Sequence, residues 1–166
     1  MYFGDSNFDR LFAGLEIILE EMGLQNIPVK KSWQLNERHY GALQGFHKSE
    51  LAGKEGEDYV FKIRRGFDTR PPALDSDDIR CPQRDSLYAN VPKEKLPFAE
   101  SLEDTINRLL PYWKEVIVPE IKKGKKVLLS AHGSDLRGLV MYLNDMTEEE
   151  VGNLDIPYSV PLVYQL

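Results

Sequence analysis

The turn at residues 131–134, Ala-His-Gly-Ser, contains the histidine with the clearest chemical potential. It follows an apolar run at residues 126–131 and precedes helical apolar spacing at residues 134–144, so we expect it where a strand leads into a helix. Ligands often bind at such strand ends, and the helix start offers free N–H groups to an anion. His132 could therefore donate a proton to a phosphoryl oxygen or accept the phosphoryl group itself. The alternative is a hydrogen-bonded surface histidine.

A second polar cluster consists of four consecutive residues, Glu37, Arg38, His39 and Tyr40, just after a predicted strand. A glutamate that is shielded from water and faces a phosphate has a raised pKa and can act as general acid or base. The alternative is a solvated loop whose charges pair with one another.

Further cations have the geometry that suits carboxylate and phosphate oxygens, namely Arg10, Lys48, Arg64 and Arg65. Taken by itself, an arginine pair on a helix is more typical of a solvated face. Only a fold that brings these cations together would make them a binding site.

Apolar periodicity predicts the elements that position these residues. Residues 68–97 are rich in Pro, Asp and Arg without an apolar period, which predicts a long surface loop. Pro111 and Pro119 are expected to bend or shorten the helix around them. The pattern predicts one α/β domain over residues 1–166, with helices at 8–22, 49–56, 58–67, 101–124, 134–144 and from 147, and strands at 27–35, 126–131 and 161–166.

Composition limits the possible partners. A net charge of −6 argues against binding to nucleic acid or to an anionic membrane, because both need a basic surface. Cys81 is the single cysteine, so it can form no intrachain disulfide and no metal site built from several cysteines. The sequence has no run of about 18 apolar residues and no signal-peptide pattern, so we expect a cytoplasmic protein.

Residues 33–45, W-Q-L-N-E-R-H-Y-G-A-L-Q-G, resemble the W-x-L-N-E-R-H-Y-G-x-L-x-G signature of cofactor-dependent phosphoglycerate mutases. Further similar stretches follow in the family's order, at residues 48–50, 63–68, 100–102, 131–133 and 136–138. The resemblance covers nearly the whole chain. It implies the histidine phosphatase superfamily fold, a three-layer α/β/α arrangement. It also implies the glycolytic interconversion of 3-phosphoglycerate and 2-phosphoglycerate through a phosphohistidine, primed by 2,3-bisphosphoglycerate and without a metal.

The resemblance also implies individual roles. Glu37 resembles the family's general acid/base, His132 its second catalytic histidine and Arg10 its phosphate-binding arginine. Four residues resemble those with which the family binds the carboxylate and phosphate of the substrate, namely Tyr40, Lys48, Arg64 and Arg65. The turn residues Gly133 and Ser134 are expected to contact the substrate as well. These roles agree with phosphoryl-transfer chemistry, which depends mostly on cations and donors around developing charge.

The departures from the family pattern concern the nucleophile. The family's phosphate-accepting histidine lies in an Arg-His-Gly motif, and no Arg-His-Gly occurs in this sequence. His39 and His47 lie in other sequence contexts, so neither replaces it. The strand that carries the motif and a second strand are expected to be missing, so that the remaining strands would not be neighbours in the sheet.

A second departure lies at the start of the helix after His132. Ser134 and Asp135 stand where the family commonly has Asn and Ser, and the extra carboxylate of Asp135 would repel a phosphate unless it points away.

Three hypotheses remain open from the sequence. The first is a phosphoglycerate mutase whose nucleophile belongs to a longer polypeptide, so that this chain alone is inactive. The second is a noncatalytic relative that binds an anion or a partner, as a homo-oligomer or together with a full-length relative. The third is a bisphosphoglycerate mutase or phosphatase, which would use the same residues with another acceptor.

Overall fold

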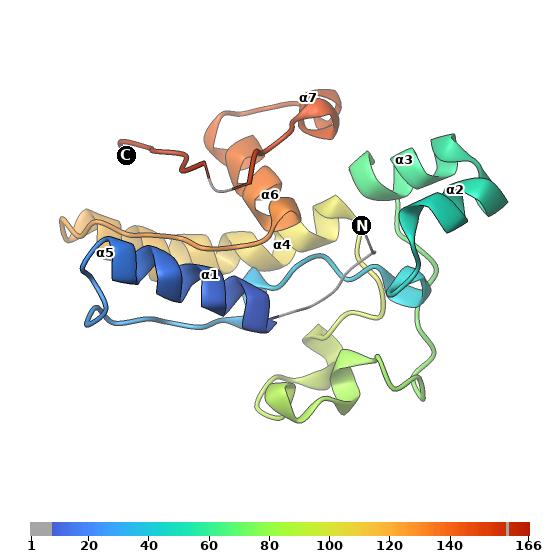
Figure 1. The fold of residues 1–166 in the computed structure, drawn as a ribbon, viewed down its shortest axis with the longest axis horizontal. Helices are drawn as coiled ribbons and strands as arrows, with labels where there is room; N and C mark the ends of the chain where they lie inside the picture. Colours follow the sequence, from blue (N-terminus) through green and yellow to red (C-terminus); the bar gives the residue numbers. More distant parts are fainter. Residues whose placement is uncertain (1–7, 159) are drawn as a thin grey trace.

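Helices dominate the described part of the chain. The computed structural model describes residues 8–158 and 160–166, with side chains from residue 11 onward. Figure 1 shows the helices in chain order: α1 (Phe8–Glu21), α2 (Lys48–Glu55), α3 (Glu57–Arg65), α4 (Leu102–Tyr112), α5 (Val118–Lys122), α6 (Gly133–Leu143) and α7 (Glu148–Asn153). These confirm the predicted helices. No helix in this part of the chain is long and apolar enough to cross a membrane.

Short turns connect the helices. Residues 68–97 contain only the 3₁₀ turns η3 (Pro82–Arg84), η4 (Ser86–Tyr88) and η5 (Lys93–Lys95), as expected for a long surface loop. The earlier signature segment contains two more, η1 (Trp33–Leu35) and η2 (Gly41–Leu43). Ser32 caps η1, because its hydroxyl accepts a hydrogen bond from the backbone N–H of Gln34.

The longest helical stretch runs from α4 into α5 without a break. Its start is fixed by a capping box in which Ser101 and Asp104 satisfy each other's backbone N–H groups. We expected Pro111 and Pro119 to bend or shorten this helix. Instead, a π turn, η6 (Trp113–Ile117), joins the two parts, and the N–H of Val118 donates to the carbonyl of Trp113. The wider turn keeps the chain helical where a proline lacks its own N–H.

Helix α6 packs against α4 at a close crossing, which Figure 1 shows. Gly138 makes the approach possible, since a Cβ there would lie 2.6 Å from Cγ1 of Ile106. The crossing buries the apolar cluster Leu109, Trp113, Ile117 and Leu139. A second cluster lies under α2 and α3 and includes Tyr40 and Leu43 from the signature segment. Both candidate segments, 37–40 and 131–134, are therefore anchored to buried side chains.

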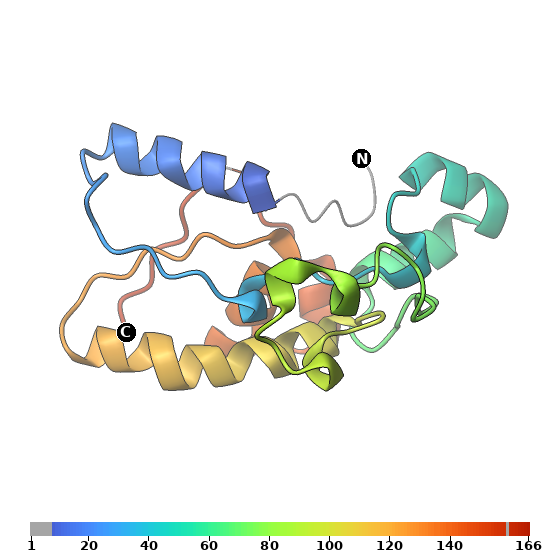
Figure 2. The same cartoon turned by 90° about the horizontal axis from the view of Figure 1, so that it is seen from below.

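The predicted strands are the main difference between sequence and structure. Residues 8–158 and 160–166 form no strand, so the α/β sheet is not formed within them, and residues 33–35 are a 3₁₀ turn. Segments 126–131 and 160–166 have neither strand nor helix, and most of their apolar side chains are exposed, for example Val127 by 44% and Val163 by 89%, whereas Leu129 packs against the cluster at the α4–α6 crossing. Figures 1 and 2 show residues 126–131 running between α1 and the α4–α5 helix. A strand needs a hydrogen-bonded neighbour, which local sequence cannot supply.

The close approach at Gly41 yields a stability prediction. Gly41 has a φ of 55°, and a Cβ there would lie 2.1 Å from the carbonyl oxygen of Pro72. We expect Gly41→Ala to lower the free energy of unfolding by about 3 kcal/mol or more, because left-handed strain and steric overlap add. Gly45→Ala is the matched control, since Gly45 also has a positive φ but nothing within 4 Å of its Cβ position. Urea unfolding that shows equal losses for both variants would contradict the steric argument.

Candidate active site

Glu37 and His132 approach each other from segments far apart in the sequence. Oε2 of Glu37 lies 4.0 Å from Nδ1 of His132, and the two side chains are 19% and 22% exposed. Glu37 is oriented by its other oxygen, Oε1, which accepts a hydrogen bond from the N–H of Arg38 at 2.8 Å. His132 is the residue just before α6, where the first N–H groups of a helix have no acceptor within the helix itself. The pair has the reach needed to exchange a proton with one small substrate.

Arg108 forms hydrogen bonds to the backbone just before Glu37 and to the first turn of α6, which follows His132. Its guanidinium donates to the carbonyl oxygens of Gln34 (2.8 Å) and Asn36 (2.5 Å). It also forms a two-pronged ion pair with Glu100, at 2.6 and 3.1 Å, and donates to Asp135 at 3.3 Å. Asn36 precedes Glu37, and Asp135 lies in the first turn of α6. All donor positions of one arginine are therefore used to join the segments that carry the candidate residues.

The charges around Arg108 are unequal, because three carboxylates lie near one buried cation. Burial works against the charge of Arg108, but Glu100 and Asp135 outweigh it and keep the pKa of Arg108 above its usual value. Burial raises the pKa of Asp135 well above its usual range, with smaller contributions from Glu37 and Glu100 that Arg108 only partly offsets. Asp135 therefore tends to hold a proton, and its side chain faces Arg108 instead of solvent.

The arginine-rich side of the site lies at the C-terminal end of α3. Arg38 is stacked over the ring of Tyr40 and donates to the Tyr40 hydroxyl at 3.0 Å. Arg38 also donates to the carbonyl oxygens of Ile63 and Arg64, at 2.6 and 3.1 Å. Arg137 from α6 donates to the same Arg64 oxygen at 3.3 Å. The backbone of Arg64 thus gathers two other arginines at one place.

The remaining predicted residues are spread more widely. Arg65 donates to the carbonyl of Leu154 at 2.8 Å and pairs with Asp155. Lys48 is the first residue of α2 and is exposed. Gly133 begins α6, and Ser134 beside it is buried. The side chain of Arg10 lies outside the described residues. The structure therefore brings together Glu37, His132, Tyr40 and the Arg64 backbone, and it does not show Lys48 or Arg65 in contact with the pair.

His39 is part of the core and not a free catalytic group. Its Nδ1 accepts a hydrogen bond from the N–H of Gly41 at 3.1 Å, and burial lowers the pKa of His39 to about 4. At neutral pH the ring is uncharged. Within residues 8–158 and 160–166, no group of three or more His, Cys, Asp or Glu side chains could hold a metal ion.

Comparison with known proteins identifies the class. No protein-family model matches the chain. A 2,3-bisphosphoglycerate-dependent phosphoglycerate mutase from Hamiltonella defensa subsp. Acyrthosiphon pisum (strain 5AT) is 52% identical over 151 residues, which cover 91% of this chain and 61% of that protein. A protein of the same name from Borreliella afzelii (strain PKo) is 52% identical over 169 aligned positions, covering 99% of this chain and 68% of that protein.

These similarities show a member of the histidine phosphatase fold class. More narrowly, the chain belongs to the family of 2,3-bisphosphoglycerate-dependent phosphoglycerate mutases. The chain spans about two thirds of the length of the curated relatives that it matches, 61% and 68%. The family resemblance drawn from residues 33–45 is thereby confirmed.

Removing the buried cation tests the role of Arg108 in holding the site. We expect Arg108→Met to lower the free energy of unfolding by about 3 to 5 kcal/mol, because Glu100 would be left buried without its partner. Arg70→Met is the matched control, since Arg70 is exposed and pairs with Asp104 at the surface. Guanidinium-chloride unfolding should show a much smaller loss for the control. Equal losses would mean that the buried pair adds nothing specific.

The raised pKa of Asp135 makes stability depend on pH. An acid whose pKa is higher in the folded than in the unfolded state weakens folding as pH rises through that interval. We therefore expect Asp135→Asn to be more stable than the wild type at pH 7, with a difference that shrinks as pH falls toward 4. The lowered pKa of His39 makes folding more stable as pH rises, but it is the same in both proteins. The difference between variant and wild type at each pH therefore reports Asp135 alone. Thermal unfolding checks this, with exposed Asp77→Asn as control. A constant difference at all pH values would contradict it.

Proposed function

We propose that this chain supplies the substrate-binding and acid/base residues of a phosphoglycerate mutase, which interconverts 3-phosphoglycerate and 2-phosphoglycerate through a phosphohistidine. The 4.0 Å approach of Glu37 to His132 carries the proposal, because it brings together the two motifs that resemble the family's acid/base and second histidine. The fully formed domain would be a three-layer α/β/α fold in which segments 126–131 and 160–166 serve as strands.

In this proposal Glu37 moves the proton of the substrate. As a hydroxyl oxygen of the glycerate would form its bond to phosphorus, the bond from phosphorus to the phosphohistidine nitrogen would break and the hydroxyl proton would pass to the Glu37 carboxylate. In the reverse direction the P–O bond would break, the histidine nitrogen would take up the phosphoryl group, and Glu37 would return the proton to the leaving oxygen. His132 hydrogen-bonds a phosphoryl oxygen, where negative charge has to be stabilised during transfer. The free N–H groups at the start of α6, including those of Gly133 and Ser134, point toward the same group.

Binding of the substrate would depend on the cations. We assign its carboxylate and phosphate to Tyr40, Lys48, Arg64, Arg65 and Arg10, as the family resemblance implies. The relatives are named as dependent on 2,3-bisphosphoglycerate, and the arginines gathered at the Arg64 carbonyl fit such a polyanion in charge. When bound, it supplies the phosphoryl group that primes the phosphohistidine. No metal is needed in this proposal.

The sequence contains no Arg-His-Gly motif, so the family's nucleophile is not among these 166 residues. We therefore expect the chain by itself to bind phosphoglycerate without converting it. Incubation with ³²P-labelled 2,3-bisphosphoglycerate should leave no acid-labile label on the protein, because no phosphoenzyme forms. Addition of 3-phosphoglycerate should still shift the imidazole NMR signals of His132.

Sodium chloride at matched ionic strength provides the control, and it should leave the His132 signals unchanged. Replacing Glu37 by Gln should weaken the shift at His132. Sustained isomerisation by a homogeneous preparation would refute the expected lack of turnover, and an unresponsive His132 would refute substrate binding. Labelled phosphate released to water, without isomerisation, would favour a phosphatase instead.

A further inference from the structure

The long loop at residues 68–97 places one tyrosine against the segment that carries Glu37. Its turn η4 is capped by Asp85, whose carboxylate accepts a hydrogen bond from the N–H of Leu87 at 2.9 Å. Within this turn Leu87 is 74% exposed, whereas Tyr88 is half-buried. The capped turn therefore presents Tyr88, and not its neighbour, to the rest of the protein.

Tyr88 contacts the residue that precedes Glu37. Its hydroxyl oxygen accepts a hydrogen bond from Nδ2 of Asn36 at 2.9 Å, although the two residues are 52 positions apart in the sequence. Burial raises the pKa of Tyr88 to about 12, and the bond from Asn36 acts in the other direction without cancelling this effect. At neutral pH the hydroxyl is therefore uncharged, and its oxygen accepts from the amide of Asn36.

Asn36 is fixed from two directions. Its carbonyl oxygen accepts from Nη2 of Arg108 in α4 at 2.5 Å, and its side chain is bonded to Tyr88 in the long loop. With φ of −69° and ψ of 151°, Asn36 ends η1 and turns the chain into the extended conformation that leads to Glu37. A peptide unit is planar, so fixing this carbonyl and this side chain also fixes where the Glu37 side chain begins.

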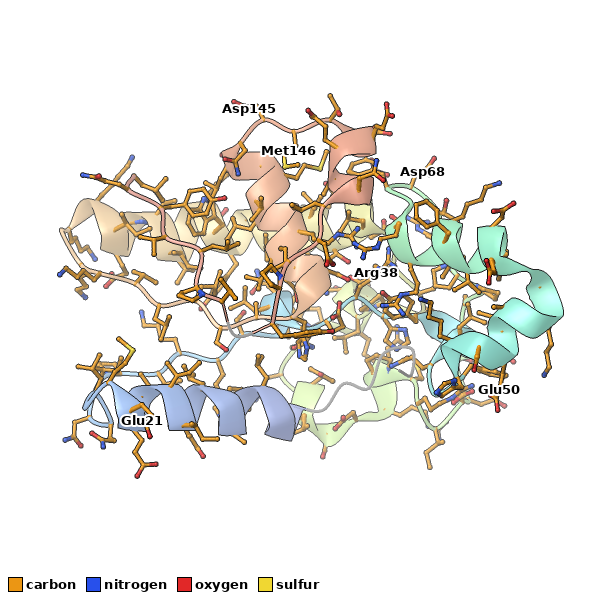
Figure 3. All side chains as sticks on the ribbon, turned by 45° about the horizontal axis from the view of Figure 1, so that its top comes forward. Glu21, Arg38, Glu50, Asp68, Asp145 and Met146 are labelled. Carbon is orange, nitrogen blue, oxygen red and sulfur yellow. The ribbon has the colours of Figure 1, made fainter. Side chains whose placement is uncertain are left out.

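The chain after Glu37 is fixed as well. Arg38 donates to the carbonyl of Ile63 at 2.6 Å, and Figure 3 shows it between α6 and α3. The backbone N–H of Arg38 donates to Oε1 of Glu37 at 2.8 Å, while Oε2 is the oxygen that approaches His132. The bond from Asn36 to Tyr88 is thus the contribution of the long loop to a carboxylate whose other supports come from α3 and α4.

Stability alone does not explain the side chain of Asn36. Its second polar atom, Oδ1, is buried and has no hydrogen-bond partner. A buried acceptor without a donor costs more free energy than a single neutral hydrogen bond, such as the one to Tyr88, contributes. An apolar side chain of similar size would avoid this cost. The pair is better explained by the orientation that it gives to the chain just before Glu37.

We propose that Tyr88 is a positioning residue, whose hydroxyl holds Asn36 so that the carboxylate of Glu37 faces His132. The long loop thereby becomes part of the site, although the family resemblance assigns no role to residues 69–97. This inference rests on the proposed function only where substrate binding is concerned, because the orientation of Glu37 can be measured without a ligand.

The amide proton of Arg38 reports this orientation, since a bond to a carboxylate moves its NMR resonance downfield. We expect Tyr88→Phe, which removes only the hydroxyl, to move the resonance upfield. Tyr164→Phe is the matched control, because Tyr164 also accepts from an asparagine amide, that of Asn144 at 2.8 Å. Asn144 lies at the opposite end of α6 from His132, so this variant should leave the Arg38 resonance unchanged.

Substrate binding gives a second measurement. The dissociation constant for 3-phosphoglycerate, followed through the NMR signals of His132, should rise about three- to tenfold in Tyr88→Phe. Asn36→Ala should have a similar effect, because it removes the other partner of the same bond. Combining the two substitutions should add little to either one alone, as expected of residues that act through a single contact.

Arg80→Met separates positioning from general anchoring of the loop. Arg80 joins the same loop to the signature segment at another point, the carbonyl of Gln44, to which it donates at 2.7 Å. This variant should leave the Arg38 resonance and the dissociation constant as they are in the wild type.

Two results would overturn the inference. One is an Arg38 resonance that Tyr88→Phe does not move, and the other is an equal effect of Tyr88→Phe and Arg80→Met on that resonance. If the wild type does not bind 3-phosphoglycerate, the proposed function fails, and the Arg38 resonance alone then decides whether Tyr88 positions Glu37.

Discussion

The buried guanidinium of Arg108 is the interaction on which the candidate site depends. It joins the carbonyls of Gln34 and Asn36 to Glu100, just before α4, and to Asp135 in the first turn of α6. Burying a cation costs least when acceptors surround its donors and acids balance its charge, and Arg108 meets both conditions. The same bonds fix the backbone on either side of the Glu37–His132 gap. A network of polar bonds, in addition to apolar packing, therefore determines the distance between the two side chains.

The site separates charge into two neighbouring regions. Around Arg108, the carboxylates of Glu100, Asp135 and Glu37 outnumber the cation, and burial, with smaller contributions from Glu37 and Glu100, raises the pKa of Asp135. Beside the Arg64 carbonyl, Arg38 and Arg137 form an excess of positive charge. Glu37 acts electrostatically on both Arg108 and Arg137, so it lies between the regions. Such a field orients a molecule that has an anionic end and a hydroxyl end.

Local patterns predicted the helices correctly because helix hydrogen bonds close within four residues, whereas a strand needs a partner from elsewhere in the chain. The segment 126–131 has a strand-like sequence but no strand to pair with among the described residues. The proximity of Glu37 and His132 was expected only from the family resemblance. Arg108 was missed, because a single arginine in an amphipathic helix gives no sign of tertiary partners. Asp135 was noted as a possible repulsive charge, and its contact with Arg108 shows how the fold accommodates it.

The site is also independent of the sheet that the family fold implies. Glu37 is placed by a turn-rich segment and His132 by the start of α6, and both segments are tied to α4 through Arg108 and through the close crossing of α6 over Ile106. None of these contacts involves a strand ladder. Segments 126–131 and 160–166 can therefore lie outside any sheet while Glu37 and His132 keep their 4.0 Å approach. For the proposed function it follows that binding of the substrate would depend on the helices, whereas transfer of its phosphoryl group would also depend on a nucleophile.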